Sequence, residues 1–209
     1  MRVSAHNGKK RVVIDQGEYY TTAKDEIIST LLGSCVACCL WDPVQRIIGM
    51  NHFLLANRRY SKSLPVIVSD AGRYGIQSME LLINKMLKMG AKRQLLKAKA
   101  FGGGNVLKSH FNGDPFFAVG EVNSRFIREF LDNENIPLVA SHLGGEHGRV
   151  IHFDASDFSV YMKRIESATE RELIAEEKQY FDQQIREHSR DEAEVVNKNI
   201  DDGHIRIWD

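Results

Sequence analysis

Two compact apolar runs near the start of the chain have the length and composition of β-strands. They are Cys35–Trp41 (CVACCLW) and Ile47–Leu55 (IIGMNHFLL), and turn-forming residues separate them. The intervening Asp42–Gln45 segment (DPVQ) has Asp and Pro at the first two positions of a type I turn. We therefore expect a β-hairpin in which Trp41 pairs with Arg46.

Apolar residues spaced three and four apart predict two helices farther along the chain. The first extends from about Ala71 to Met89 and ends where Gly90 follows. The second is carried by the apolar residues between Val122 and Leu131 and ends before Pro137. Further strands are expected at Lys97–Phe101, Arg149–Phe153 and Ser159–Arg164. Because strands and helices are mixed without strict alternation, the pattern favours an α+β fold over a doubly wound parallel sheet.

The charges divide the chain into two parts, although the formal net charge is +0. Residues 1–166 hold 22 Lys+Arg and 16 Asp+Glu, whereas residues 167–209 hold 6 and 12. We therefore expect a domain of residues 1–166, with net charge +6, and an acidic C-terminal extension of residues 167–209, with net charge −6. Five apolar residues of the extension recur at roughly helical spacing: Leu173, Ile174, Tyr180, Phe181 and Ile185. They predict an amphipathic helix, which is either solvated or docks on the basic domain or on a partner.

Composition excludes several classes of protein. With 43% hydrophobic residues, the 209-residue chain can bury a core. A balanced net charge argues against nucleic-acid binding as the main activity. The apolar runs are too short to span a bilayer, and no secretory signal is recognisable. Three cysteines clustered within Cys35–Cys39 do not suit a disulfide framework. We therefore expect a cytoplasmic protein with reduced thiols.

Cys35 and His52 are the candidate catalytic pair of the predicted hairpin. With Trp41 opposite Arg46, Cys35 lies directly across from His52. Opposed residues of an antiparallel pair share a face and have Cβ atoms about 4.5–5.5 Å apart, so a thiol and an imidazole placed there can hydrogen-bond. A one-residue slip would send them to opposite faces. Gly33 and Ser34 mark a turn that places the thiol at the entrance of a strand.

Other interpretations of these residues remain open. Cysteine is often a small buried apolar residue, which is the expected role of Cys38 and Cys39. The Cys35-x-x-Cys38 spacing is also typical of zinc ligands, but residues three apart in a strand point to opposite faces. Three histidines recur every five residues, and a glycine-rich loop interrupts them, which favours scattered surface histidines: His142, His147 and His152.

The segment Thr30–Leu55 (TLLGSCVACCLWDPVQRIIGMNHFLL) resembles the CheD family of chemoreceptor glutamine deamidases. Its specific feature is a Leu-Gly-Ser-Cys block followed by Asn-His, with the histidine seventeen residues after the cysteine. The resemblance continues through Ala98–Asn105 (AKAFGGGN) and the glycines of Gly144–Arg149, and it covers roughly residues 16–164.

The resemblance implies a role for each site residue. Cys35 matches the family's nucleophile and His52 its catalytic histidine. The family's third member is a hydroxyl residue at the place that holds Ser29 here, with Thr30 one residue later as the alternative. An oxyanion requires fixed donors, for which we consider the backbone N–H groups around Gly33, Ser34 and Cys35. The glycine loop of Gly102, Gly103 and Gly104 is the second candidate for these donors. Its alternative role is to form a tight turn. No metal or organic cofactor is required.

The implied activity is hydrolysis of glutamine side chains to glutamate through a cysteine thioester, which would also act on glutamate methyl esters. The implied substrate is the cytoplasmic helical region of methyl-accepting chemotaxis receptors, and a CheC-type phosphatase is a further implied partner. The alternative is a non-catalytic binding module that contacts the receptor or the phosphatase. The expected architecture is an α+β fold: a layered mixed β-sheet sandwich with flanking helices, the Cys/His site on adjacent strands, and a helical C-terminal extension.

Overall fold

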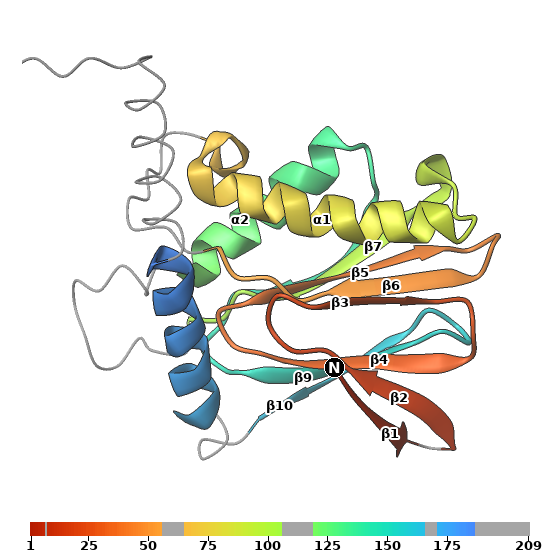
Figure 1. The fold of residues 1–209 in the computed structure, drawn as a ribbon, viewed down its shortest axis with the longest axis horizontal. Coiled ribbons are helices and arrows are strands. Elements are labelled where there is room, and N and C mark those ends of the chain that lie inside the picture. The colour runs from red at the N-terminus through yellow and green to blue at the C-terminus, as the bar shows by residue number, and fades with distance from the viewer. Residues whose placement is uncertain (7, 56–64, 106–118, 166–170, 187–209) are drawn as a thin grey trace, which may run out of the picture.

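The computed structural model describes residues 1–209 except 7, 56–64, 106–118, 166–170 and 187–209. Two five-stranded sheets face each other, and helices cover the outer face of the second sheet (Figure 1). In spatial order, the first sheet consists of β1 (Arg2–His6), β2 (Lys9–Val13), β4 (Glu26–Leu32), β9 (Arg149–Asp154) and β10 (Val160–Arg164). The second consists of β3 (Tyr19–Thr22), β6 (Ile47–Asn51), β5 (Val36–Asp42), β7 (Lys97–Gly102) and β8 (Leu138–Leu143).

Each sheet is mixed, with one parallel pair among antiparallel neighbours. The parallel pairs are β2 with β4 and β7 with β8. The helices that cover the second sheet are α1 (Asp70–Lys88) and α2 (Val119–Asn133), and two short 3₁₀ turns are η1 (Val66–Val68) and η2 (Arg93–Leu95). The predicted α+β class is confirmed, and both predicted helices are present. None of the helices in the described part of the chain has the length and apolar character needed to cross a bilayer.

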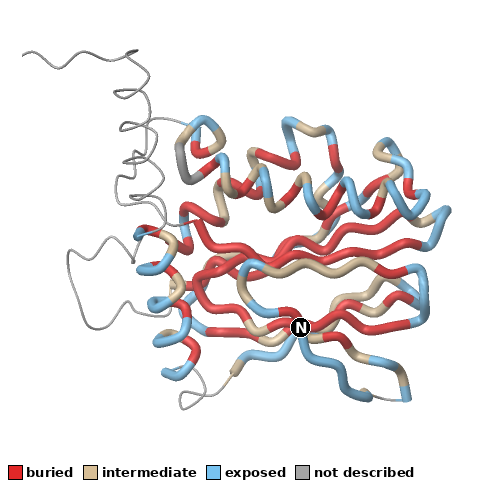
Figure 2. Tube along the Cα trace, viewed as in Figure 1, coloured by how far each residue is buried: buried red, intermediate tan, exposed pale blue. Residues whose placement is uncertain are grey.

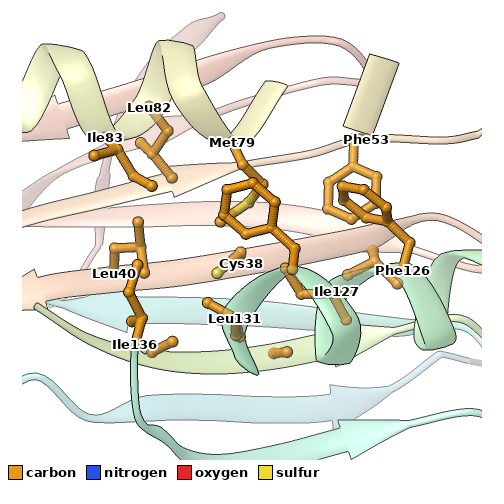
Figure 3. Close-up of a cluster of buried hydrophobic side chains, with 14 of the residues drawn as sticks. Cys38, Leu40, Phe53, Met79, Leu82, Ile83, Phe126, Ile127, Leu131 and Ile136 are labelled. Carbon is orange, nitrogen blue, oxygen red and sulfur yellow. The ribbon is translucent and has the colours of Figure 1, made fainter. Parts of the chain in front are cut away.

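Side chains of β5 alternate between two buried clusters. Val36, Cys38 and Leu40 point towards α1 and α2, where Figure 3 shows Cys38 and Leu40 among the helix side chains. Cys35 and Cys39, with Ala37 between them, point into the space between the two sheets. Figure 2 shows that buried positions run along the inner strands of both sheets, which places β5 at the centre of the core.

The predicted register of the β5–β6 hairpin is wrong by two residues. Asp42 pairs with Ile47, so Trp41 pairs with Ile48 rather than with Arg46. The reason is that Asp42 stays in the strand while its Oδ1 atom accepts the backbone N–H groups of Val44 and Gln45, at 2.8 and 3.0 Å. The predicted direct pairing of Cys35 with His52 is therefore also wrong. A shift of two residues preserves the face of every side chain, so both residues still point between the sheets.

A third helix, residues 171–186, follows the last strand and is called here the C-terminal helix. It stands at one end of the two sheets, where it is the blue helix of Figure 1. Phe181 and Ile185 belong to the buried cluster between the sheets, and Leu173 is also buried. The amphipathic helix predicted for the extension is therefore present, and its apolar face packs on the sandwich.

Candidate active site

The site forms where three strands end at the same edge of the space between the sheets. Cys35 directly precedes β5, and His52 directly follows β6. Val36 and Phe53 exchange backbone hydrogen bonds of 3.0 and 2.9 Å, which extends the hairpin just far enough to hold the neighbouring Cys35 and His52 together. Thr30 reaches the imidazole from β4 in the opposite sheet. Both sheets therefore contribute to one buried cluster of polar side chains.

The hydroxyl group beside His52 belongs to Thr30 and not to Ser29. Thr30 Oγ1 lies 2.8 Å from His52 Nδ1, whereas Ser29 Oγ lies 2.7 Å from Nδ1 of His152 on β9. The strand alternation explains the difference, because adjacent residues of β4 point to opposite faces. Of the two hydroxyls considered from the sequence, the structure brings only that of Thr30 to His52.

The hydrogen bonds of Thr30 assign the tautomer of His52. Thr30 Oγ1 lies 2.8 Å from the backbone carbonyl of Ile14, and donation of the single hydroxyl proton there is the arrangement that gives this buried carbonyl a donor. The Thr30 oxygen must then accept from His52, which places the imidazole proton on Nδ1. Nε2 is left with a lone pair, and this buried atom has no hydrogen-bond partner among the described residues. A histidine held in this form can accept a proton at Nε2.

Burial keeps both members of the thiol–imidazole pair uncharged in this arrangement. Cys35 is 0% and His52 2% exposed. Burial raises the pKa of the Cys35 thiol well above its ordinary value, and the nearby carboxylate of Glu177 raises it further. Burial also lowers the pKa of His52 to about 4, against an opposing effect of Glu177. The thiolate is therefore disfavoured while Glu177 is present.

Three consecutive backbone N–H groups converge in front of Cys35, and a carboxylate occupies their focus. Glu177 Oε1 accepts from Gly33 N at 2.9 Å and Cys35 N at 3.2 Å. Glu177 Oε2 accepts from Ser34 N at 2.7 Å and Ser34 Oγ at 2.6 Å. A Cβ atom on Gly33 would lie 2.8 Å from Glu177 Oε2, so the glycine leaves room for the close approach. The loop therefore provides preorganised N–H donors that can bind an oxyanion or a carboxylate.

The second glycine loop supports this site from behind. Gly103 N donates to Cys35 O and Gly104 N donates to Gly33 O, each at 2.7 Å. These two N–H groups are therefore engaged and do not point to a substrate. Gly102 and Gly103 adopt φ angles of 111° and 63°, which favour glycine. Of the two loops considered for the oxyanion donors, the geometry favours that of Gly33, with Gly102–Gly104 as its support.

Two buried polar residues at the site were missed by the sequence analysis. Asn123 of α2 donates from Nδ2 to Ser34 O at 2.8 Å and accepts from Leu55 N at 2.8 Å, so it fixes the loop relative to the helix layer. Glu177 lies on the C-terminal helix and is 0% exposed. Each residue interrupts the apolar face of an amphipathic helix, and that interruption is the signal that could have identified them.

Cys35, His52 and Glu177 offer atoms within 4.8 Å of one another and are the group that could hold a metal ion among the described residues. Both oxygens of Glu177, however, already accept hydrogen bonds from the loop, which suits an anion better than a cation. Cys38 points to the helix side of β5, away from Cys35, as the strand spacing predicts. The Cys35-x-x-Cys38 zinc pair is therefore not formed.

A cavity of about 430 Å³ adjoins the buried cluster. His52 and Thr30 line it, together with Leu173 and Glu176 of the C-terminal helix. The cavity therefore brings this helix next to the strands that carry the polar cluster.

A cysteine, a histidine oriented by a hydroxyl, and converging N–H donors are the parts of thiol-dependent acyl-transfer hydrolases. Comparison with known proteins gives a consistent result. The family model described as CheD chemotactic sensory transduction matches residues 56–164. The "Probable chemoreceptor glutamine deamidase CheD 1" of Geobacter sulfurreducens is 47% identical over 201 residues, which are 96% of this chain and 98% of that protein. This chain belongs to the CheD family, as the sequence resemblance predicts.

Other relatives agree with this assignment. The "Probable chemoreceptor glutamine deamidase CheD 2" of Shewanella oneidensis is 47% identical over 192 residues, covering 88% of this chain and 92% of that protein. The "Probable chemoreceptor glutamine deamidase CheD" of Rhizobium etli is 49% identical over 145 residues, covering 69% of this chain and 74% of that protein. The solved structure of the hypothetical protein YfiH from Bacillus licheniformis matches with a TM-score of only 0.36 and 14% identity, covering 59% of this chain and 49% of that chain.

Proposed function

We propose that this chain is a protein-glutamine deamidase that converts glutamine side chains in the cytoplasmic helical region of chemotaxis receptors to glutamate. The observation that carries the proposal is the buried set of Cys35, His52 and Thr30 next to three converging N–H groups. The curated relatives are named for this activity, which supports the choice of a receptor glutamine as substrate. The reaction takes place in the cytoplasm, where such receptors expose their helices.

In the proposed mechanism, His52 Nε2 accepts the proton of the Cys35 thiol, and the thiolate attacks the carboxamide carbon of the substrate. The developing oxyanion accepts hydrogen bonds from the N–H groups of Gly33, Ser34 and Cys35, which are fixed before the reaction begins. His52 returns the proton to the departing ammonia. Water then hydrolyses the thioester and leaves glutamate. The same steps act on a glutamate methyl ester, with methanol as the leaving group.

Within this proposal, residues 1–166 form the catalytic domain and residues 167–209 form the extension. The net charge of +6 on residues 1–166 favours association with an acidic helical receptor. A CheC-type phosphatase is a second proposed partner. The alternative function, a binding module without catalysis, is not favoured, because the curated relatives are named for the deamidase activity and Cys35 and His52 lie together in one buried cluster.

The experiment that tests the proposal is incubation of a receptor cytoplasmic fragment with the protein, followed by peptide mass spectrometry. We expect glutamine-containing peptides to gain the mass of an amide-to-acid conversion, with release of ammonia. C35A should abolish the conversion while circular dichroism shows an intact fold. C39A is the matched control, because Cys39 is equally buried on the same face of β5 but lies away from the donors. Conversion by C35A at the wild-type rate would contradict the proposed nucleophile.

A further inference from the structure

The C-terminal helix places a glutamate side chain where a substrate must bind. Leu173, Phe181 and Ile185 are buried against the sandwich, and Glu177 lies between them on the same helix face. These four residues are spaced four apart, so a single face of the helix carries both the apolar anchors and the acid. The same face therefore packs on the sandwich through its apolar residues and places the carboxylate of Glu177 at the end of the space between the sheets.

The contacts of Glu177 are those of a bound reaction product. Its carboxylate accepts from Gly33 N, Ser34 N and Cys35 N, which are the donors that the proposed mechanism assigns to the oxyanion. Its oxygens also lie within reach of the thiol and the imidazole. A glutamate side chain presented on a helix is chemically the product of deamidating a glutamine on a receptor helix.

We propose that the C-terminal helix is an intramolecular product analogue that occupies the groove for the receptor helix and closes the enzyme until it is displaced. This inference rests on the proposed function. It also defines the substrate more closely: a glutamine on a helix with apolar residues four positions before it and four and eight positions after it. The groove would recognise those residues with the surfaces that now contact Leu173, Phe181 and Ile185.

The electrostatics of the site agree with a closed, inactive state. Both burial and the carboxylate of Glu177 raise the pKa of the Cys35 thiol. Withdrawal of the helix removes the negative charge and admits water, and both changes favour the thiolate. Binding of a receptor must also compete with the docked helix. If the helix is docked nine-tenths of the time, the apparent affinity for the receptor falls about tenfold.

The E177Q variant provides a direct test, because it supplies a carboxamide in place of the carboxylate. The Cys35 sulfur would attack the amide carbon, the C–N bond would break with release of ammonia, and water would hydrolyse the thioester to a carboxylic acid. We expect purified E177Q to show the mass of the acid at position 177, whereas C35A/E177Q retains the amide. The conversion should be first order and independent of protein concentration, because it occurs within one chain.

The matched control is E172Q, which introduces a carboxamide at an exposed position of the same helix. Its amide should persist, and its activity towards the receptor fragment should equal that of the wild type. Conversion of E172Q at the rate of E177Q would show unspecific deamidation and would overturn the inference. A rate for E177Q that rises in proportion to protein concentration would overturn the intramolecular arrangement.

Receptor deamidation, measured in parallel, separates this inference from the proposed function. If wild-type protein deamidates the receptor fragment but E177Q keeps its amide, the helix is not a product analogue and the proposed function stands. If neither amide is converted, the proposed function fails and the inference fails with it. E177A gives a second readout: we expect kcat/KM for the receptor fragment to rise about tenfold for a helix docked nine-tenths of the time. A fall in kcat/KM with the fold intact would overturn autoinhibition.

Discussion

Replacement of Thr30 by valine removes one hydroxyl group and keeps the shape of the side chain. The hydroxyl has two partners, Ile14 O and His52 Nδ1, each at 2.8 Å in a buried environment. Without it, both partners lose a hydrogen bond, which we expect to lower the free energy of unfolding by about 1–3 kcal/mol. The lost hydrogen bond also holds the imidazole proton on Nδ1. A loss of about 1.4 kcal/mol of that preference would reduce the competent tautomer, and kcat/KM with it, about tenfold.

The assay is ammonia release from a receptor fragment, combined with urea unfolding to separate activity from stability. T30S restores the hydroxyl and should recover most of the activity. S29A is the control at the neighbouring position, because Ser29 contacts His152 and not His52, so its kcat/KM should stay close to that of the wild type. Nitrogen chemical shifts of the His52 ring would report the tautomer directly. A loss in S29A equal to that in T30V, or an unchanged kcat/KM in T30V, would refute the assignment of the hydroxyl partner.

Two further predictions concern stability. Burial lowers the pKa of His52 to about 4 although Glu177 and Glu18 oppose the shift, so stability present above pH 6.5 should decrease as the pH falls towards 4, by up to about 3 kcal/mol. Urea unfolding at several pH values should show that the free energy of unfolding decreases less for H52N than for the wild type. An equal dependence of this free energy on pH in both proteins would contradict the lowered pKa of His52. G103A should destabilise the fold by about 1–3 kcal/mol or more, because φ is 63° and a Cβ atom would lie 2.8 Å from Gly120 O. G8A, with φ of 78° and open space around the added atom, should lose less in the same thermal unfolding measurement.

Helices α1 and α2 could be predicted from the sequence because each buries one face against a sheet, and burial of one face imposes a period on the chain. The strand β5 could be predicted for the opposite reason. It is buried on both faces and therefore forms a continuous apolar run. Its register with β6 could not be predicted, because the turn is decided by the Asp42 side chain. The same Asp-Pro sequence suits a type I turn and an Asx turn that differ by one residue in where the loop begins.

The N-terminal strands β1–β4 and the strand β8 were not predicted. β1 and β8 are largely exposed and show no apolar face that would mark them as strands. β4 is buried, but Ser29 and Thr30 interrupt its apolar run. The partner of Ser29, His152, lies more than one hundred residues away in the sequence, and the partner of Thr30, His52, follows a strand of the other sheet. Their hydroxyls become compatible with a core only through those contacts, which a local pattern does not contain.

The association of Cys35 with His52 could be predicted despite the wrong register, because an error of two residues preserves the face of a strand. Glu177 could not be found in the same way. Its acidic neighbours make the whole extension resemble a solvated element, and the apolar periodicity of the helix does not distinguish a buried acid from an exposed one. The sequence also contains no local link between residues 33–35 and residue 177.

The donors of the loop explain why the helix must carry an acid at position 177. Three N–H groups and the Ser34 hydroxyl would be left without an acceptor if an apolar side chain closed the site, at a cost of about 1–3 kcal/mol for each buried group. A glutamine would supply only one oxygen, and in the proposed reaction the enzyme would convert it to glutamate. Glutamate accepts from every donor and is the end point of that reaction. Within the proposed function, a glutamate at position 177 therefore satisfies the loop donors and is inert to the reaction, whereas a glutamine there would be converted.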